Sequence, residues 1–173
     1  MSPYPLPTTQ LLLSVPNGGT PEQLYYGSRT SDADIRSICE TARRRNAYPV
    51  YGMGYPCETA LSVRHADGNL TLQMAVIGVK ETRLTKENAT LTVIELKDKV
   101  YPFFVNICYK AWQDADVIET WTEIRHEEKK PRPTSAVCFC LLACPPRQCL
   151  AVTSFRCLGQ TKDNSARKRC NRV

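Results

Sequence analysis

The 173-residue sequence is poor in the side chains that most often transfer protons, because it holds only two histidines, His65 and His126. It also lacks a Gly-x-Ser-x-Gly elbow, a phosphate-binding loop and a dinucleotide fingerprint. His65 precedes Ala-Asp-Gly and is predicted to sit at a turn, whereas His126 is predicted to end a strand. These absences argue against nucleophilic, nucleotide-dependent and hydride-transfer chemistry, and we expect no catalytic residue and no cofactor.

Long apolar runs are equally scarce. The longest, Leu11–Leu13 and the interrupted run Ala136–Cys144, are far too short to span a bilayer. Residues 1–16 have neither a basic start nor a small-residue cleavage site, so no secretory signal is visible. We therefore expect no membrane partner, and the absence of a signal favours a cytoplasmic location.

Charge and cysteine both change abruptly near Pro131. Residues 1–130 hold 15 Lys and Arg against 16 Asp and Glu, whereas residues 131–173 hold 8 against 1. Six of the nine cysteines lie in that second stretch, without the C-x2-C pairs typical of structural zinc sites, so no metal is expected. The sequence predicts a domain at 1–130 and a Cys/Arg/Pro-rich tail at 131–173, disordered or irregular. Because the domain carries no basic excess, no nucleic-acid partner is expected.

The domain is predicted to be mainly β. Alternating or β-branched segments recur about every ten residues, separated by turn residues such as Pro16–Gly19, which is typical of an antiparallel β-sandwich. The predicted strands are 8–15, 23–27, 60–64, 70–76 (running on to Gly78), 89–96, 103–112 and 117–124. No parallel βαβ pattern interrupts them, so the expected fold is a supersandwich-like antiparallel β-sandwich.

One short helix is expected at Ser31–Arg43. Ser31 is a suitable N-cap, and Asp34 three residues later is an acidic variant of the capping box. Apolar side chains recur at helical spacing and predict one buried stripe that packs on a sheet; they are Ile35, Ile38, Cys39 and Ala42.

Glycosidases work through paired carboxylates, and four lie close together near the end of the domain. They are Asp114, Asp116, Glu119 and Glu123. The segment 112–116 is predicted to be a turn, and the two glutamates are predicted to share one face of the following strand. A solvated outer face explains this group better than a catalytic pair.

The order of landmarks along the chain resembles the N-terminal domain of glycoside hydrolase family 36, over about residues 8–130. The landmarks are Leu24–Arg29 (Leu-Tyr-Tyr-Gly-Ser-Arg), the short helix, Tyr48–Gly54, Glu58–Leu61, His65–Gly68 and Asp114–Ile124. The resemblance implies a parent that is a retaining α-galactosidase, acts on raffinose-type sugars and galactomannan, and forms oligomers. It places the catalytic pair in a (β/α)8 barrel, which takes roughly 250 residues and does not fit after residue 130.

The resemblance also singles out the loop Gly54–Ala60. In many family members an aspartate here reaches a sugar pocket of a neighbouring subunit. Tyr55 replaces that aspartate and Cys57 replaces an arginine, whereas Glu58 and Ala60 agree with the family pattern. Tyr55 and Glu58 are therefore the candidate substrate-binding residues, with weak binding of a galactoside or oligosaccharide at most.

Three functions stay open. The first is a non-catalytic domain of an α-galactosidase, and the second is a stand-alone carbohydrate-binding module that stacks sugars on Tyr55, Trp112 or Trp121. The third, a nucleic-acid binder acting through the basic tail, ranks last. For the tail itself, a reading-frame shift in the gene is favoured over a genuine extension, and translating the other frames from codon 131 distinguishes the two.

Overall fold

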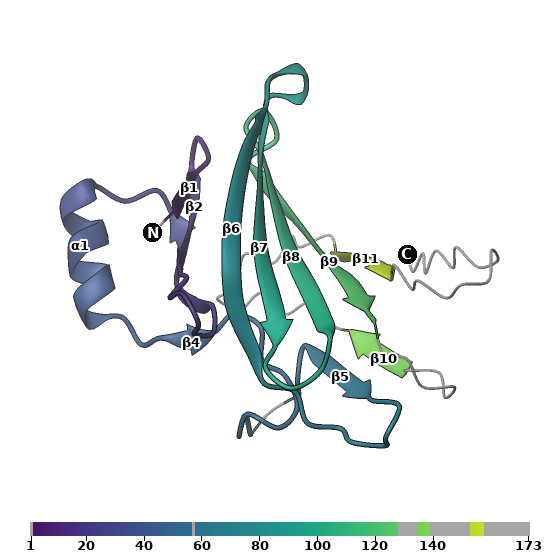
Figure 1. Ribbon diagram of the computed structural model, residues 1–173. Coiled ribbons are helices and arrows are strands. Elements are labelled where there is room, and N and C mark those ends of the chain that lie inside the picture. The colour runs from purple at the N-terminus through teal and green to yellow at the C-terminus, as the bar shows by residue number, and fades with distance from the viewer. Residues whose placement is uncertain (1, 57, 128–134, 139–152, 158–173) are drawn as a thin grey trace.

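The computed structural model describes residues 2–56, 58–127, 135–138 and 153–157 (Figure 1). The strands are β1 (Ser2–Pro5), β2 (Thr9–Ser14), β3 (Glu22–Ser28), β4 (Arg45–Asn46), β5 (Leu61–Arg64), β6 (Met74–Leu84), β7 (Ala89–Asp98), β8 (Phe103–Trp112), β9 (Val117–His126), β10 (Ser135–Cys138) and β11 (Thr153–Cys157). One α-helix, α1 (Asp32–Thr41), and one 3-10 turn, η1 (Thr85–Glu87), complete the elements.

The strands form three sheets. The larger two are a four-stranded sheet in the order β1-β2-β3-β4 and a five-stranded sheet in the order β11-β9-β8-β7-β6, and β10 pairs with β5 in a small third sheet. Every described pairing between named strands is antiparallel except that of β11 with β9. The prediction of a mainly antiparallel β fold with one short helix is confirmed.

The core lies between the two larger sheets. Alternate residues of β7 and β8 are buried, among them Ile94, Leu96 and Ile107, as period-2 side chains on one face of a sheet must be. Leu11 and Leu13 of β2 belong to the same buried cluster from the opposite layer. This shared apolar layer is what makes the arrangement a sandwich.

The β2–β3 turn closes part of one edge of the sandwich. The N–H of Gly18 donates to the carbonyl of Val76 at 3.0 Å, and the N–H of Val76 donates to the carbonyl of Gly19 at 2.8 Å. Gly18 adopts φ 72°, a left-handed conformation that glycine reaches without steric cost. The predicted turn at Pro16–Gly19 therefore also covers the start of the edge strand β6.

Helix α1 begins where the sequence predicts but is not buried. The hydroxyl of Ser31 accepts from the N–H of Asp34, and the Asp34 carboxylate accepts from the N–H of Ser31, which completes the capping box. No residue of the helix is buried, so the predicted buried stripe is wrong: Ile35 and Ile38 are only half-buried. Figure 1 shows the reason, because α1 lies to the outside of the four-stranded sheet with only one side against it.

The strand predicted at 70–76 is displaced, since β6 runs from Met74 to Leu84. The N–H of Thr71 donates to the side-chain carbonyl of Asn69, and the N–H of Leu72 donates to the carbonyl of Tyr51, so this segment is held in a loop. Beyond Ile77, where the register shifts by one residue, β6 continues because every residue pairs with β7. Side chains there are exposed on both faces, which hides the alternation from a sequence pattern.

The predicted irregular tail falls largely outside the described residues. Within it, β10 pairs with β5 through Ser135↔Arg64 to Cys138↔Leu61, and β11 pairs with β9 through Thr153↔Thr120 to Cys157↔Ile124. The domain boundary at residue 130 remains a prediction.

Candidate functional site

The loop that carries Tyr55 and Glu58 leaves the sandwich at the end opposite the β6–β7 hairpin (Figure 1). Its two ends are fixed by backbone hydrogen bonds: the N–H of Tyr51 donates to Leu61 at 3.2 Å, and the N–H of Ala60 donates to Pro49 at 2.7 Å. Val50 and Leu61, both fully buried, form a parallel bridge at the base of the loop. The loop therefore projects from a rigid base.

Gly52 brings the loop close to the segment that follows β5. It adopts φ 98°, and a Cβ added there would lie 2.4 Å from Cγ2 and 3.1 Å from Cα of Thr71. Only glycine fits at this position, because any other residue would be strained at this φ and its Cβ would clash with Thr71. The loop and the segment around Thr71 consequently form one surface at this end of the sandwich.

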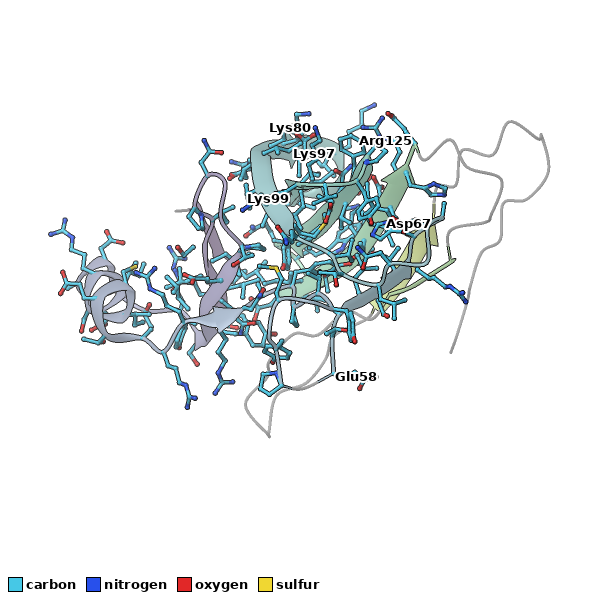
Figure 2. All side chains as sticks on the ribbon, turned by 60° about the horizontal axis from the view of Figure 1, so that its bottom comes forward. Glu58, Asp67, Lys80, Lys97, Lys99 and Arg125 are labelled. Carbon is cyan, nitrogen blue, oxygen red and sulfur yellow. The ribbon has the colours of Figure 1, made fainter. Side chains whose placement is uncertain are left out.

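Large apolar side chains gather on that surface. Tyr51, Met53, Tyr55 and Leu70 are 49%, 42%, 41% and 42% exposed, and we call these four residues the end patch. Glu58 is exposed on the same loop, and Figure 2 shows it at the lower edge of the molecule, apart from Asp67. Cys57 lies outside the described residues. Both candidate residues are thus open to solvent, and their role in binding stays a prediction.

A polar cluster borders the end patch. The hydroxyl of Tyr101 donates to the Asp67 carboxylate at 2.7 Å and accepts from the Asn69 amide at 2.9 Å, while its ring stacks on that of His65 at a centroid distance of 3.7 Å. The N–H of Asn69, followed by the Tyr101 hydroxyl, lowers the pKa of Asp67 below its usual 3.8. His65 is buried at the predicted turn, so it serves the fold of this loop.

The four carboxylates near the end of the domain each accept hydrogen bonds within the sandwich. Asp116 accepts from Thr8 and Thr9, and Asp114 accepts from the Asn88 amide at 2.6 Å. Glu119 and Glu123 lie on one face of β9, as predicted, and accept from the indole N–H groups of Trp112 and Trp121, each at 3.2 Å. The segment between β8 and β9 is the predicted turn.

Trp112 has a further neighbour on that face. The Nζ atom of Lys110 lies 3.8 Å from the ring centroid of Trp112, a cation–π contact that covers one side of the indole. On the same sheet Lys80 pairs with Glu95, and Arg125 pairs with Glu127. Figure 2 shows Lys80, Lys97, Lys99 and Arg125 along one side of the molecule, away from Glu58.

The described part of the chain holds neither a metal-binding cluster nor a membrane-spanning helix. No group of three or more His, Cys, Asp or Glu side chains there could hold a metal ion. No helix among those residues is long and apolar enough to cross a membrane. The tail cysteines, for which no metal is expected from the sequence, lie mostly outside this part.

Residues 19–143 match the family model of the glycosyl hydrolase family 36 N-terminal domain. The matched stretch covers most of the chain and runs past residue 130 into β10. The chain therefore belongs to the glycosyl hydrolase family 36 N-terminal domain family. No curated protein matches the chain.

Solved structures of α-galactosidases share the fold. A variant of the α-galactosidase AgaA from Geobacillus stearothermophilus with 1-deoxygalactonojirimycin is 15% identical, with a TM-score of 0.65 over 75% of this chain and 22% of its own. Another AgaA variant, in complex with raffinose, is 15% identical with a TM-score of 0.64 over 72% and 22%. The α-galactosidase from Lactobacillus brevis is 15% identical with a TM-score of 0.59 over 70% and 21%. This chain spans about a fifth of each of these proteins.

Proposed function

We propose that this chain is a non-catalytic N-terminal domain of an α-galactosidase whose full-length form hydrolyses terminal α-galactosides. The observation that carries the proposal is the match of residues 19–143 to the family 36 N-terminal domain, and the family resemblance implies that the catalytic pair lies in a separate (β/α)8 barrel. A (β/α)8 barrel takes roughly 250 residues, more than the whole of this chain.

The hydrogen bonds that the four carboxylates near the end of the domain accept support the same proposal. A glycosidase needs two carboxyl groups that face each other across a sugar, roughly 5–9.5 Å apart, with one free to protonate the leaving group. Asp114, Asp116 and Glu119 instead accept hydrogen bonds from other elements, and Glu123 accepts from Trp121 of its own strand. Their geometry suits a structural role.

The experiment is an activity assay of the purified 173-residue chain with p-nitrophenyl α-galactoside. We expect no release of p-nitrophenol above the uncatalysed rate. Turnover that persists through successive purification steps, and that falls when Asp114 or Glu119 is replaced by its amide, would overturn the proposal. An active family 36 enzyme added to the same sample serves as the positive control.

A second candidate is weak sugar binding through Tyr55 and Glu58. The exposure of Tyr55 beside an exposed carboxylate favours it, because aromatic rings stack on sugars and carboxylates accept from their hydroxyls. Among the aromatic platforms considered, Trp112 is a poorer choice because Lys110 covers one side of its ring.

Titration with raffinose and methyl α-galactoside, followed by NMR, tests this candidate. We expect millimolar binding that Tyr55→Ala abolishes and Glu58→Gln weakens. Glu40→Gln, an exposed glutamate on α1, is the matched control and should bind as the wild-type chain does. Absence of any shift at saturating sugar, or equal binding by Tyr55→Ala, refutes it.

A further inference from the structure

The turn between β2 and β3 contains the only Asn-Gly pair of the sequence, Asn17-Gly18. Both residues are exposed, and a Cβ added at Gly18 would meet no atom within 4 Å. Asparagine is chemically labile, and a following glycine leaves the next backbone nitrogen without a side chain to shield it. The turn therefore combines a sequence that favours deamidation with open access to water.

Deamidation at this pair needs only the chain itself and water. The backbone nitrogen of Gly18 attacks Cγ of Asn17, and the side-chain amide nitrogen leaves as ammonia, carrying the proton that Gly18 gives up. Water then opens the cyclic imide. Attack of water at Cγ gives an aspartate with the original main chain. Attack at the backbone carbonyl gives an isoaspartate, whose main chain runs through Cβ and Cγ.

The fold holds the attacking nitrogen in a hydrogen bond. The N–H of Gly18 donates to the carbonyl of Val76 at 3.0 Å, and the N–H of Val76 donates to the carbonyl of Gly19 at 2.8 Å. Val76 is buried in β6, so its side of these bonds is fixed. Gly18 must give up its proton and turn toward Asn17 before it can react. Opening of these hydrogen bonds must therefore precede the modification.

The same two hydrogen bonds join the two larger sheets. The turn belongs to the four-stranded sheet through β2 and β3, whereas Val76 belongs to the five-stranded sheet (Figure 1). An isoaspartate lengthens the main chain directly before Gly18, so Gly18 and Gly19 can no longer both align with Val76. An aspartate leaves the length of the main chain unchanged and should keep both bonds.

We propose that Asn17 is a site of spontaneous deamidation whose rate is limited by opening of the hydrogen bond from Gly18 to Val76, and that isoaspartate formed there detaches the turn from β6. Since the lengthened turn does not close again on β6, each conversion leaves the two sheets less tightly joined at this edge. The inference goes beyond the proposed domain role and does not depend on it.

A second Asn-Gly pair in the same chain provides the matched comparison. Met53→Asn places an asparagine before Gly54, which is exposed and has the same φ of 72° as Gly18, but whose N–H donates to no described residue. In the folded 173-residue chain, Asn17 should deamidate about tenfold or more slowly than the introduced asparagine, because its hydrogen bonds must open first. In urea the two rates should agree within about threefold, because both segments are then open.

Peptide mapping by mass spectrometry measures both rates in one sample, and an unfolding midpoint of Met53→Asn close to that of wild type establishes that the variant is folded. Asn17→Gln is the control for the chemistry, since glutamine forms its larger cyclic imide far more slowly and the turn should stay unmodified. Equal rates at the two pairs in the folded chain would overturn the role of the hydrogen bond. An Asn17 that stays intact in urea would overturn the site itself.

Amide hydrogen exchange tests the detachment of the turn. After incubation, the isoaspartate form is separated from the unmodified chain and compared with Asn17→Asp. The N–H of Val76 should exchange about tenfold or more faster in the isoaspartate form, and at the wild-type rate in Asn17→Asp. An isoaspartate form in which Val76 exchanges as in the wild-type chain would show that the turn stays attached and would overturn this part of the proposal.

Discussion

Replacing Asp116 with alanine should destabilise the sandwich by detaching one of its hairpins. The carboxylate, in the turn between β8 and β9, accepts from the N–H groups of Thr8 at 3.1 Å and Thr9 at 3.2 Å, and from both hydroxyls. Asp116→Ala removes these four bonds together. Because the site is partly exposed, about 0.5–1 kcal/mol per bond applies, so the free energy of unfolding should fall by about 2–4 kcal/mol. For a chain of this size, this corresponds to a Tm lower by roughly 5–15 °C.

Urea unfolding followed by fluorescence measures the effect, since the only tryptophans, Trp112 and Trp121, lie on the two strands that the turn joins. Asp116→Asn separates the hydrogen bonds from the backbone. Asp116 adopts φ 53°, which asparagine tolerates better than alanine, so the amide variant should lose about half as much stability. Asp114→Ala, in the same turn but exposed, is the matched control and should cost less than about 0.5 kcal/mol. Equal midpoints for wild type and Asp116→Ala would refute the reasoning.

The hydrogen bonds of Asp116 with Thr8 and Thr9 also predict how the stability of the domain changes at low pH. Burial raises the pKa of Asp116, but the hydrogen bonds from Thr8 and Thr9 outweigh it and hold the pKa below the usual 3.8. In the unfolded chain the Asp116 carboxylate takes up its proton at a higher pH than in the folded chain. The stabilisation is therefore complete above the pKa of the unfolded chain, and it is lost as the pH falls through the lower pKa of the folded chain. The stability difference between wild type and Asp116→Asn should shrink as the pH is lowered below 3.8. A difference that is constant with pH would contradict the assignment.

Two further substitutions test the end that carries the candidate site. Gly52→Ala should lower the unfolding free energy by about 2–3 kcal/mol, because it combines strain at φ 98° with a Cβ 2.4 Å from Thr71. Gly54→Ala has the strain at φ 72° but open space, so it should cost about 1 kcal/mol, and urea unfolding would contradict us if the two were equal. Tyr101→Phe keeps the stack on His65 but removes the hydroxyl, so the pKa of Asp67, followed by NMR, should rise while staying below 3.8 because the Asn69 N–H remains. An unchanged pKa would show that the hydroxyl does not act on this carboxylate.

The strands that the sequence predicts best are those with one buried face and clear turns at both ends. β8 begins and ends where the alternation from Phe103 to Trp112 predicts, because its inner side chains are buried and its outer ones are mostly polar or aromatic. The predicted bounds of β6 differ from the observed ones because the side chains beyond Ile77 are exposed on both faces. This exposure removes the alternation of apolar and polar residues that indicates a strand. The burial predicted for the apolar stripe of α1 is wrong because helical spacing indicates which side of a helix is apolar. It does not indicate how much of that side a neighbouring element covers.

The site was predictable only where it rests on local sequence. Tyr55 and Glu58 emerged from the resemblance of their loop, and both lie exposed as loop residues should. The bond between Tyr101 and Asp67 joins residues 34 apart, so it depends on the tertiary fold and no short pattern indicates it.

Two aspartates, Asp98 and Asp116, each hold a turn at one end of the sandwich through several hydrogen bonds. Asp98 is buried at the β7–β8 turn and accepts from the N–H groups of Gln73 at 2.6 Å and of Val100 and Tyr101 at 2.8 Å. Asp116 does the same for the opposite turn, between β8 and β9. A carboxylate that accepts from several backbone N–H groups in this way is held in place by the fold, whereas the acid of a glycosidase must lie beside the sugar and protonate the leaving group. Replacing either aspartate should therefore change the stability of the domain and leave no reaction to be lost, which is the behaviour expected of a scaffold.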